Sequence, residues 1–217
     1  MILIIEYFRH QNDDRHREYL KCLEENIKND FISKIEIFIE DETPLEIFSN
    51  KININRFGKR PTYDDMFSFC SEKYNGEICI ISNSDIIFDD TLKYVNNENI
   101  KNKFLALTRW DIKPNDDLTF FDRKDSQDCW IFKSPINMKE KADFYLGKPG
   151  CDNRICRIAH DSGLFATNPS KLIITKHLHL TNLRNYGIKD TVGGLHMRLV
   201  PNSDINQQSI YEIFKYS

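Results

Sequence analysis

The stretch ICIISNSDIIFDD, residues 78–90, decides the fold. Residues 78–81 are all apolar, a run that is typical of a strand buried on both faces of a sheet. Residues 82–85 then bring the chain to the surface with one amide, Asn83, and one carboxylate, Asp85. In an extended segment these two side chains point to the same side. The segment is therefore either a turn, because such residues bond their own backbone, or a site for a hard cation or a ribose.

The chain on the N-terminal side of this stretch alternates strands with helices. Runs of apolar residues predict the strands, and apolar residues at helical spacing predict the helices. Continuous apolar strands separated by helices indicate an α/β fold with a mostly parallel central sheet and helices on both faces. The expected strands are residues 2–8, 35–39, 51–55 and 77–81, and the expected helices are residues 13–28 and 62–73.

The pattern is looser on the C-terminal side, where short strands alternate with loops. This part predicts a smaller mixed region beside the main sheet. The expected elements are a short helix at residues 91–95, strands at residues 104–108, 119–121, 129–132 and 171–180, and a closing helix at residues 207–215.

Composition narrows the class of protein. A chain of 217 residues with 40% hydrophobic content and 15 phenylalanines can bury a sizeable core, and it fits one domain, residues 1–217. Its 30 basic and 33 acidic residues leave a net charge of −3 without a basic stripe. We therefore expect no nucleic-acid partner.

Neither the N-terminus nor the cysteines indicate secretion. The first ten residues, MILIIEYFRH, lack the basic and long apolar regions of a signal peptide or membrane anchor, so we expect a cytoplasmic protein. The cysteines show no zinc spacing, and reduced thiols packed in the core are expected rather than disulfides. They are Cys22, Cys70, Cys79, Cys129, Cys151 and Cys156.

A second candidate site lies at the end of the expected strand at residues 171–180 and just after it. His177 and His179 alternate onto one face, and Arg184 follows. Two histidines on a strand face are more often packing residues than ligands. An imidazole on a metal ion and a guanidinium on phosphate oxygens would together suit a metal-bound diphosphate.

Two further segments carry candidate carboxylates. The turn at residues 147–150 presents Asp152 and Asn153 at the start of a helix, where a carboxylate is most often a cap. Asp128 and Trp130 lie in the strand at residues 129–132 or beside it. Trp130 is either a core aromatic or a surface for a sugar ring, whose hydroxyls would bond the carboxylate.

Arg60 lies just before the helix at residues 62–73. A phosphate near the helix start would suit it, although a solvated arginine is the commoner case.

Taken in this order, the candidate segments resemble a nucleotide-sugar-dependent glycosyltransferase of the GT-A fold. The resemblance implies a nucleotide-binding half, residues 1–95, and a half for the acceptor and metal closure, residues 96–217. It places Asn83-Ser84-Asp85 where the family has Asp-x-Asp, the motif that holds a cation on the donor diphosphate. Within the family, the chain resembles the N-terminal glycosyltransferase domain of a chlorovirus capsid-glycan protein. This resemblance implies viral capsid glycosylation, a rhamnosyltransferase role and a location in the host cytoplasm.

The resemblance also implies how the metal would be held. Some members close the metal site with a late histidine followed five residues on by a basic residue, and His179 and Arg184 reproduce that spacing. Asn83 departs from the family, so either Asp85 and His179 alone would hold the cation, with donor phosphate and water completing its shell, or the cation would bind only when the donor is present. An imidazole ligand favours manganese over magnesium.

The donor and acceptor sites follow from the same resemblance. It implies a nucleoside-diphosphate sugar, by default with uridine, and an oligosaccharide or glycoprotein acceptor bound near Trp130 and Asn153. Asp152 or Asp128 would be the general base of an inverting enzyme, and neither would be required as a base in a retaining one. The residues implied for the donor are Tyr7, Arg9, Asp41, Arg60, Asn83, Ser84 and Arg184.

Two rival functions share the α/β half. A non-catalytic domain that binds a nucleotide sugar or glycan would account for Asn83. A nucleotidyltransferase is disfavoured, because the segment EYFRHQNDD after the first strand has no glycine to bring backbone close to a triphosphate.

Overall fold

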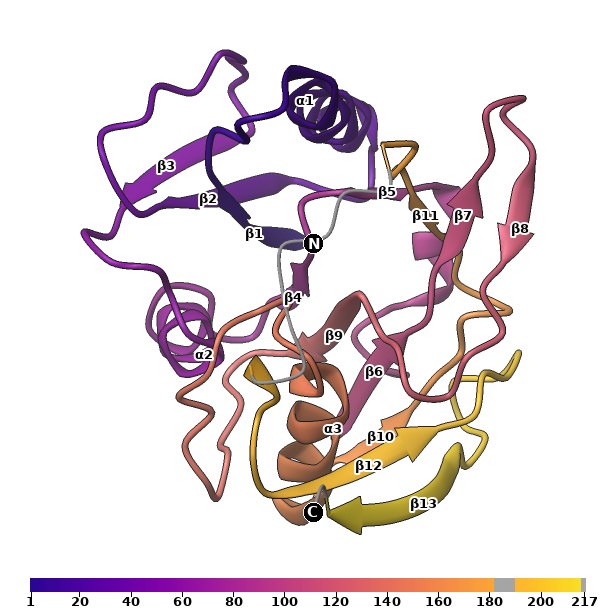
Figure 1. Ribbon diagram of the computed structural model, residues 1–217. Helices are drawn as coiled ribbons and strands as arrows, with labels where there is room; N and C mark the ends of the chain where they lie inside the picture. The colour runs from indigo at the N-terminus through magenta and orange to yellow at the C-terminus, as the bar shows by residue number, and fades with distance from the viewer. Residues whose placement is uncertain (182–189, 216–217) are drawn as a thin grey trace.

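The computed structural model of the protein describes residues 1–181 and 190–215, and a seven-stranded sheet forms its centre (Figure 1). The strand order is β10-β6-β9-β4-β1-β2-β3. Strands β4, β1, β2 and β3 are mutually parallel, while β9 runs antiparallel to both β4 and β6. The predicted mostly parallel α/β sheet is therefore confirmed. Its strands are β1 (Ile2–Tyr7), β2 (Lys34–Ile39), β3 (Ile52–Arg56), β4 (Ile78–Ser82), β6 (Lys103–Leu107), β9 (Cys129–Lys133) and β10 (Phe165–Thr167).

Helices cover both faces of this sheet, as predicted (Figure 1). Side chains along β1 point alternately to the two faces of the sheet, so the core has two parts. Leu3 and Ile5 pack with Leu23 of α1 on one face, while Ile2 and Ile4 pack with residues of α2 and α3 on the other. The carboxyl ends of the parallel strands are left open between these two layers. The helices are α1 (Asp13–Lys28), α2 (Tyr63–Lys73) and α3 (Cys151–Asp161).

The remaining elements form two small sheets and one short helix. One sheet has the order β5-β11-β7-β8, and the other pairs β12 with β13. The 3-10 helix η1 (Asp90–Tyr94) matches the short helix expected there. The strands are β5 (Ile86–Phe88), β7 (Trp110–Ile112), β8 (Leu118–Phe120), β11 (Thr175–His177), β12 (Leu195–Leu199) and β13 (Ile210–Lys215).

One expected element at the C-terminal side was wrong, and a second is shorter than expected. The closing helix at residues 207–215 is instead strand β13, whose side chains alternate between half-buried and exposed as they pair with β12. The strand expected at residues 171–180 is paired only over β11, because Leu172 and Ile173 form a turn back to the Pro169 carbonyl.

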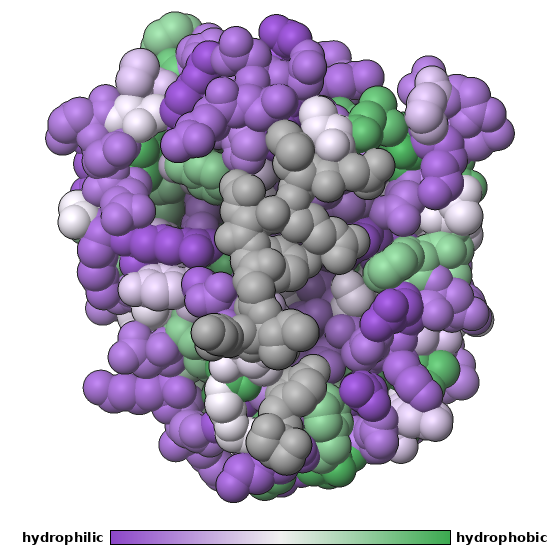
Figure 2. Space-filling view, viewed as in Figure 1, coloured by the Kyte–Doolittle hydropathy of each residue, from purple (hydrophilic) through white to green (hydrophobic). Residues whose placement is uncertain are grey.

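The surface and the core agree with the composition. All six cysteines are buried and free, as expected. Hydrophilic side chains cover most of the described surface on the face seen in Figure 2. Within residues 1–181 and 190–215, no helix combines the length and the apolar character needed to cross a membrane.

Candidate active site

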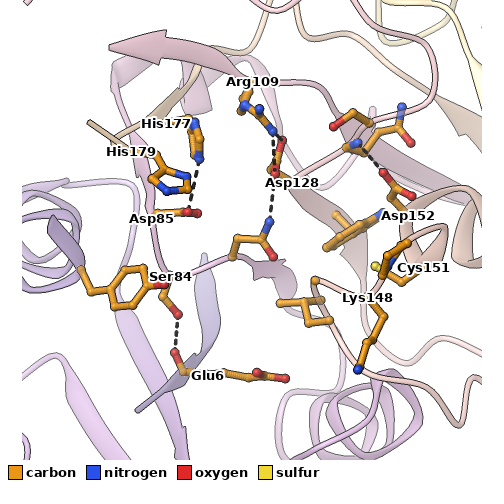
Figure 3. Close-up of a pocket in the computed structure, with 18 of the residues that line it drawn as sticks. Glu6, Ser84, Asp85, Arg109, Asp128, Lys148, Cys151, Asp152, His177 and His179 are labelled. Atoms are coloured by element: carbon orange, nitrogen blue, oxygen red, sulfur yellow. Dashed lines mark hydrogen bonds and ion pairs between the residues drawn. The ribbon is translucent and has the colours of Figure 1, made fainter. Parts of the chain in front are cut away.

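A cavity of about 750 Å³ opens at the carboxyl ends of β1 and β4. Ligands of open α/β sheets bind at this edge, because the strand ends leave a crevice between the helical layers. The residues after β4, the start of β9, the start of α3 and the end of β11 all reach it (Figure 3). Most of the residues singled out in the sequence line this cavity, namely Tyr7, Arg60, Asn83, Ser84, Asp85, Asp128, Trp130, Asp152 and His179.

Three of the expected site residues that the structure describes are not among those that line the cavity. Arg9 lies on the surface and pairs with Asp13 and Glu46, and the exposed Asp41 accepts a hydrogen bond from the Thr43 backbone. Asn153 is buried behind the cavity, where it donates to Gln127 Oε1 at 3.2 Å. Arg184 lies outside the described residues.

Asp85 is the most constrained of the predicted ligands. It is 7% exposed, and its Oδ2 atom accepts a hydrogen bond from Arg15 and lies 3.2 Å from His177 Nε2. Arg15 belongs to the first turn of α1 and also donates to the Leu178 carbonyl at 2.8 Å. Burial alone would raise the pKa of the Asp85 carboxyl, but His177 and Arg15 hold that pKa well below its usual range. Asp85 is therefore an ionised carboxylate with one oxygen already engaged.

The two histidines differ in their charge. His177 Nδ1 lies 2.9 Å from Asp111, and its Nε2 faces Asp85. Burial disfavours the charged ring, yet these two carboxylates raise the pKa of His177 to about 9. Burial, with Arg15 and His177 nearby, lowers the pKa of His179. Near neutral pH His177 is an imidazolium that donates to both carboxylates, whereas His179 is a neutral imidazole.

The cluster of Asp85, His177 and His179 fits a divalent cation. One possible ligand atom from each residue lies within 4.8 Å of the others. Asp85 Oδ1 and His179 Nε2 are both buried without a hydrogen-bond partner among the described residues. Buried polar atoms are almost always paired, so two such atoms in one cluster indicate a missing common partner. A carboxylate oxygen and a neutral imidazole nitrogen are suitable ligands, while the charged His177 holds Asp85 in place.

Asn83 has a defined partner, which explains its presence beside Asp85. Its side-chain amide donates to Asp128 Oδ1 at 2.9 Å, and its backbone N–H donates to the Asp128 carbonyl at 3.0 Å. Arg109 donates to Asp128 and, at 2.9 Å, to Asp111, which in turn binds His177. A continuous polar network therefore joins the residue after β4 to the start of β9 and to β11.

Asp152 lies on the opposite wall of the cavity, at the start of α3 (Figure 3). The helix is capped by Gly150 in a left-handed conformation with φ 78°, so Asp152 is not the capping residue. Its carboxylate accepts hydrogen bonds from the backbone N–H of Asn153 at 2.9 Å and of Gln127 at 3.2 Å. Burial outweighs these bonds and raises the pKa of Asp152 to about 7. A carboxyl of that pKa can take up a proton near neutral pH.

The other predicted residues have structural partners. Trp130 is 1% exposed and packs edge-on against Tyr63 with 5.1 Å between ring centroids, the core role considered above. Arg60 donates to Glu6, and Ser84 Oγ donates to the Glu6 carbonyl, although both residues line the cavity.

Several cavity residues were not identified in the sequence. Arg15 reaches Asp85 across 70 positions of the chain, and Arg109 reaches Asp128 across 19. A charged residue in the first turn of a helix gives no sign that it points inward. Glu6 and Gln127 likewise carry no motif; the only signal for Glu6 is a carboxylate at the end of an otherwise apolar strand.

Comparisons with known proteins place the fold. No protein-family model matches the chain, and no curated protein does. Among solved structures, it is similar to the mannosyltransferase PcManGT from Pyrobaculum calidifontis in complex with GDP-Man and Mn²⁺, with a TM-score of 0.53 and 12% identity. It is also similar to TarS from S. aureus in complex with UDP-GlcNAc, with a TM-score of 0.52 and 10% identity.

The matches cover 85% and 88% of this chain but only 58% and 61% of those two chains. At such low identity the likeness shows a shared GT-A-like fold.

Proposed function

We propose that this chain is a glycosyltransferase that moves a sugar from a nucleoside diphosphate sugar to a hydroxyl group of a glycan acceptor. One observation carries the proposal. A single cavity holds Asp85 Oδ1 and His179 Nε2, which have no hydrogen-bond partner in the described part of the chain, on one wall, and the Asp152 carboxyl, with its raised pKa, on another. The two similar solved structures both contain a nucleotide sugar, which supports a donor of that class.

Asp85 Oδ1 and His179 Nε2 would hold a divalent cation. A cation bound there would supply Lewis-acid stabilisation of the negative charge that develops on a departing nucleoside diphosphate. Arg15 and the charged His177 keep Asp85 ionised and fix its orientation. The nitrogen ligand favours manganese over magnesium, and Mn²⁺ is the ion bound in the mannosyltransferase.

Asp152 is the better candidate for the general base of an inverting reaction. Asp128 already accepts hydrogen bonds from Arg109 and Asn83, so its carboxylate oxygens are engaged by other side chains. Asp152 has no cationic partner among the described hydrogen bonds, and burial has already raised its pKa. It would take the proton of the acceptor hydroxyl as that hydroxyl attacks the sugar.

The finer features of the donor and acceptor are part of the same proposal. A uridine donor, an oligosaccharide or glycoprotein acceptor, hexosyl or rhamnosyl transfer and a place in viral capsid glycosylation all rest on the family resemblance of the sequence.

The decisive experiment measures release of nucleoside diphosphate from a panel of nucleotide sugars with Mn²⁺, Mg²⁺ or a chelator. We expect turnover with a divalent cation, and its loss on chelation. Asp85→Asn should weaken cation binding at least about tenfold, whereas Asp90→Asn, at an exposed position five residues on, should leave it unchanged. Full activity of Asp85→Asn would disprove the assignment of the cation site.

A non-catalytic binding domain is the second candidate, and Asn83 favours it. Residue 83 is an amide that donates to Asp128, so the segment offers a cation one carboxylate and not the two of Asp-x-Asp. Binding of nucleotide sugars without release of nucleoside diphosphate, even with glycan acceptors present, would establish this alternative.

A further inference from the structure

Glu6 is a buried carboxylate that the proposed reaction does not use. It is the second-last residue of β1, is 7% exposed and lines the cavity. Figure 3 shows its side chain extending along the cavity on the Lys148 side, away from Asp85. A buried carboxylate is retained at a cost in stability, so its partners indicate its role.

In the part of the chain that the structure describes, the ion pair between Glu6 and Arg60 leaves one carboxylate oxygen without a partner. Arg60 Nε and Nη2 both donate to Glu6 Oε2, at 3.1 and 3.0 Å. A guanidinium and a carboxylate usually pair through both oxygens. Here Oε1 is buried and has no hydrogen-bond partner among the described residues.

The polar groups around Glu6 are already engaged. Arg60 Nη2 also donates to the Leu146 carbonyl at 2.6 Å, Ser84 Oγ donates to the Glu6 backbone, and Lys148 pairs with Asp190 at 3.2 Å. Because a carboxylate oxygen only accepts hydrogen bonds, the missing partner of Oε1 is an N–H or O–H group. The cavity is the side from which such a group can come.

We propose that Glu6 Oε1 is a specificity determinant that accepts a hydrogen bond from the bound nucleotide sugar. The donor group is either the ring N–H of a keto base, as in uracil or guanine, or a sugar hydroxyl. Arg60 is a positioning residue that holds Oε2 and so turns Oε1 to the ligand. This inference rests on the proposed function and adds to it a rule for which donors are bound.

Glu6→Gln tests the inference because it reverses the polarity of one atom. Arg60 offers only N–H donors, so the new amide turns its oxygen to Arg60 and places its NH₂ where Oε1 was. An acceptor of hydrogen bonds is thereby replaced by a donor. Glu6→Met is the second variant, because it removes the acceptor without supplying a donor. Glu98→Gln, at an exposed position, is the matched control.

Dissociation constants are measured by calorimetry with Mn²⁺ for UDP, CDP, GDP, ADP, UDP-glucose and GDP-mannose. The measurements are made at about pH 8.5, above the pKa of about 7 to which burial raises the Glu6 carboxyl. If Glu6 binds a base, the wild type prefers UDP to CDP and GDP to ADP by about tenfold. Glu6→Gln then reverses the preference, and Glu6→Met abolishes it.

If Glu6 instead binds a sugar hydroxyl, the base preference stays unchanged in the variants. They then lose the extra affinity of the nucleotide sugar over its nucleoside diphosphate. Dissociation constants of both variants within about threefold of the Glu98→Gln control for every probe would overturn the inference. Failure of all probes to bind the wild type would instead disprove the proposed function.

Discussion

At the scale of single residues, Asp152 gives the most direct test of catalysis. Asp152→Asn keeps the shape of the side chain but cannot take up a proton. We expect the transfer rate to fall by about 10²-fold or more, with the dissociation constant of the donor changed by less than about threefold. Equal loss of transfer and of donor binding would show that Asp152 is structural.

Titration of Asp152 should change the transfer rate and the stability of the protein in opposite directions. Transfer by the wild type should increase as pH rises through about 7, because only the ionised carboxylate is a base. Stability should change in the opposite direction. The pKa of Asp152 in the folded protein is raised above the unfolded value, so the stability it contributes is present at low pH and is lost between about pH 4 and pH 7. Thermal midpoints of the wild type and Asp152→Asn, measured from pH 4 to pH 8, should therefore diverge in favour of the variant.

Asn83 tests whether the departure from Asp-x-Asp is structural. Asn83→Asp would set a carboxylate against Asp128 in place of the 2.9 Å hydrogen bond. We expect a loss of about 1 to 3 kcal/mol in the free energy of unfolding, measured by urea denaturation. Asn83→Ala, which removes the bond without adding charge, should be less harmful. A more stable Asn83→Asp protein would show that the hydrogen bond from Asn83 does not hold Asp128 in place.

The sequence could predict several residues that line the cavity but not all of their partners. Asp85 and Asp152 were identifiable because each follows a clear strand end or turn. Arg15 was not, because its interaction with Asp85 depends on how α1 lies against the segment after β4. Long-range side-chain pairs of this kind are created by packing and leave no local pattern.

At the scale of elements, the side chain of Asn26 joins α1 to β5 through two hydrogen bonds to the backbone, as a neighbouring strand would. Asn26, 3% exposed, donates to the Ile86 carbonyl at 2.8 Å and accepts from the Phe88 N–H at 2.9 Å. Asn26→Leu leaves both backbone groups unpaired, and we expect a loss of about 2 to 5 kcal/mol in the free energy of unfolding. Glu24→Gln, on the exposed side of the same helix, should be neutral. Equal denaturation midpoints for the two variants would contradict this role.

The strands that the sequence predicted best are those buried on both faces. A continuous apolar run is typical of such a strand and marks both of its ends, so β1, β2 and β4 lie within about a residue of the expected bounds. The direction of β9 was not predictable, because an apolar strand reads the same whether its neighbours are parallel or antiparallel. Strand β12 was missed, since LHMRL mixes apolar and basic residues without a run, and its partner β13 was taken for a helix.

At the scale of the whole molecule, the central sheet ties the two halves of the chain together. Strand β4 pairs on one side with β1 and on the other with β9, whose residues lie about 50 positions later. A fragment of residues 1–95 would expose the β9 edge of β4 and lose the cover of α3. We expect this fragment to be unfolded or aggregated by circular dichroism and size exclusion. A monomeric fragment with cooperative unfolding would show that the N-terminal half is an independent domain.

The six buried cysteines also make local opening of the folded protein measurable. They are distributed over α1, α2, α3, β4 and β9, so every layer of the core carries at least one thiol. Burial raises the pKa of most of them, including Cys22 and Cys129, and this suppresses the reactive thiolate. An alkylating reagent can therefore label each thiol only when the packing around that thiol opens. The labelling rate of each cysteine, read by mass spectrometry, would measure how often each layer opens, and a bound ligand should slow the layers that enclose the cavity most.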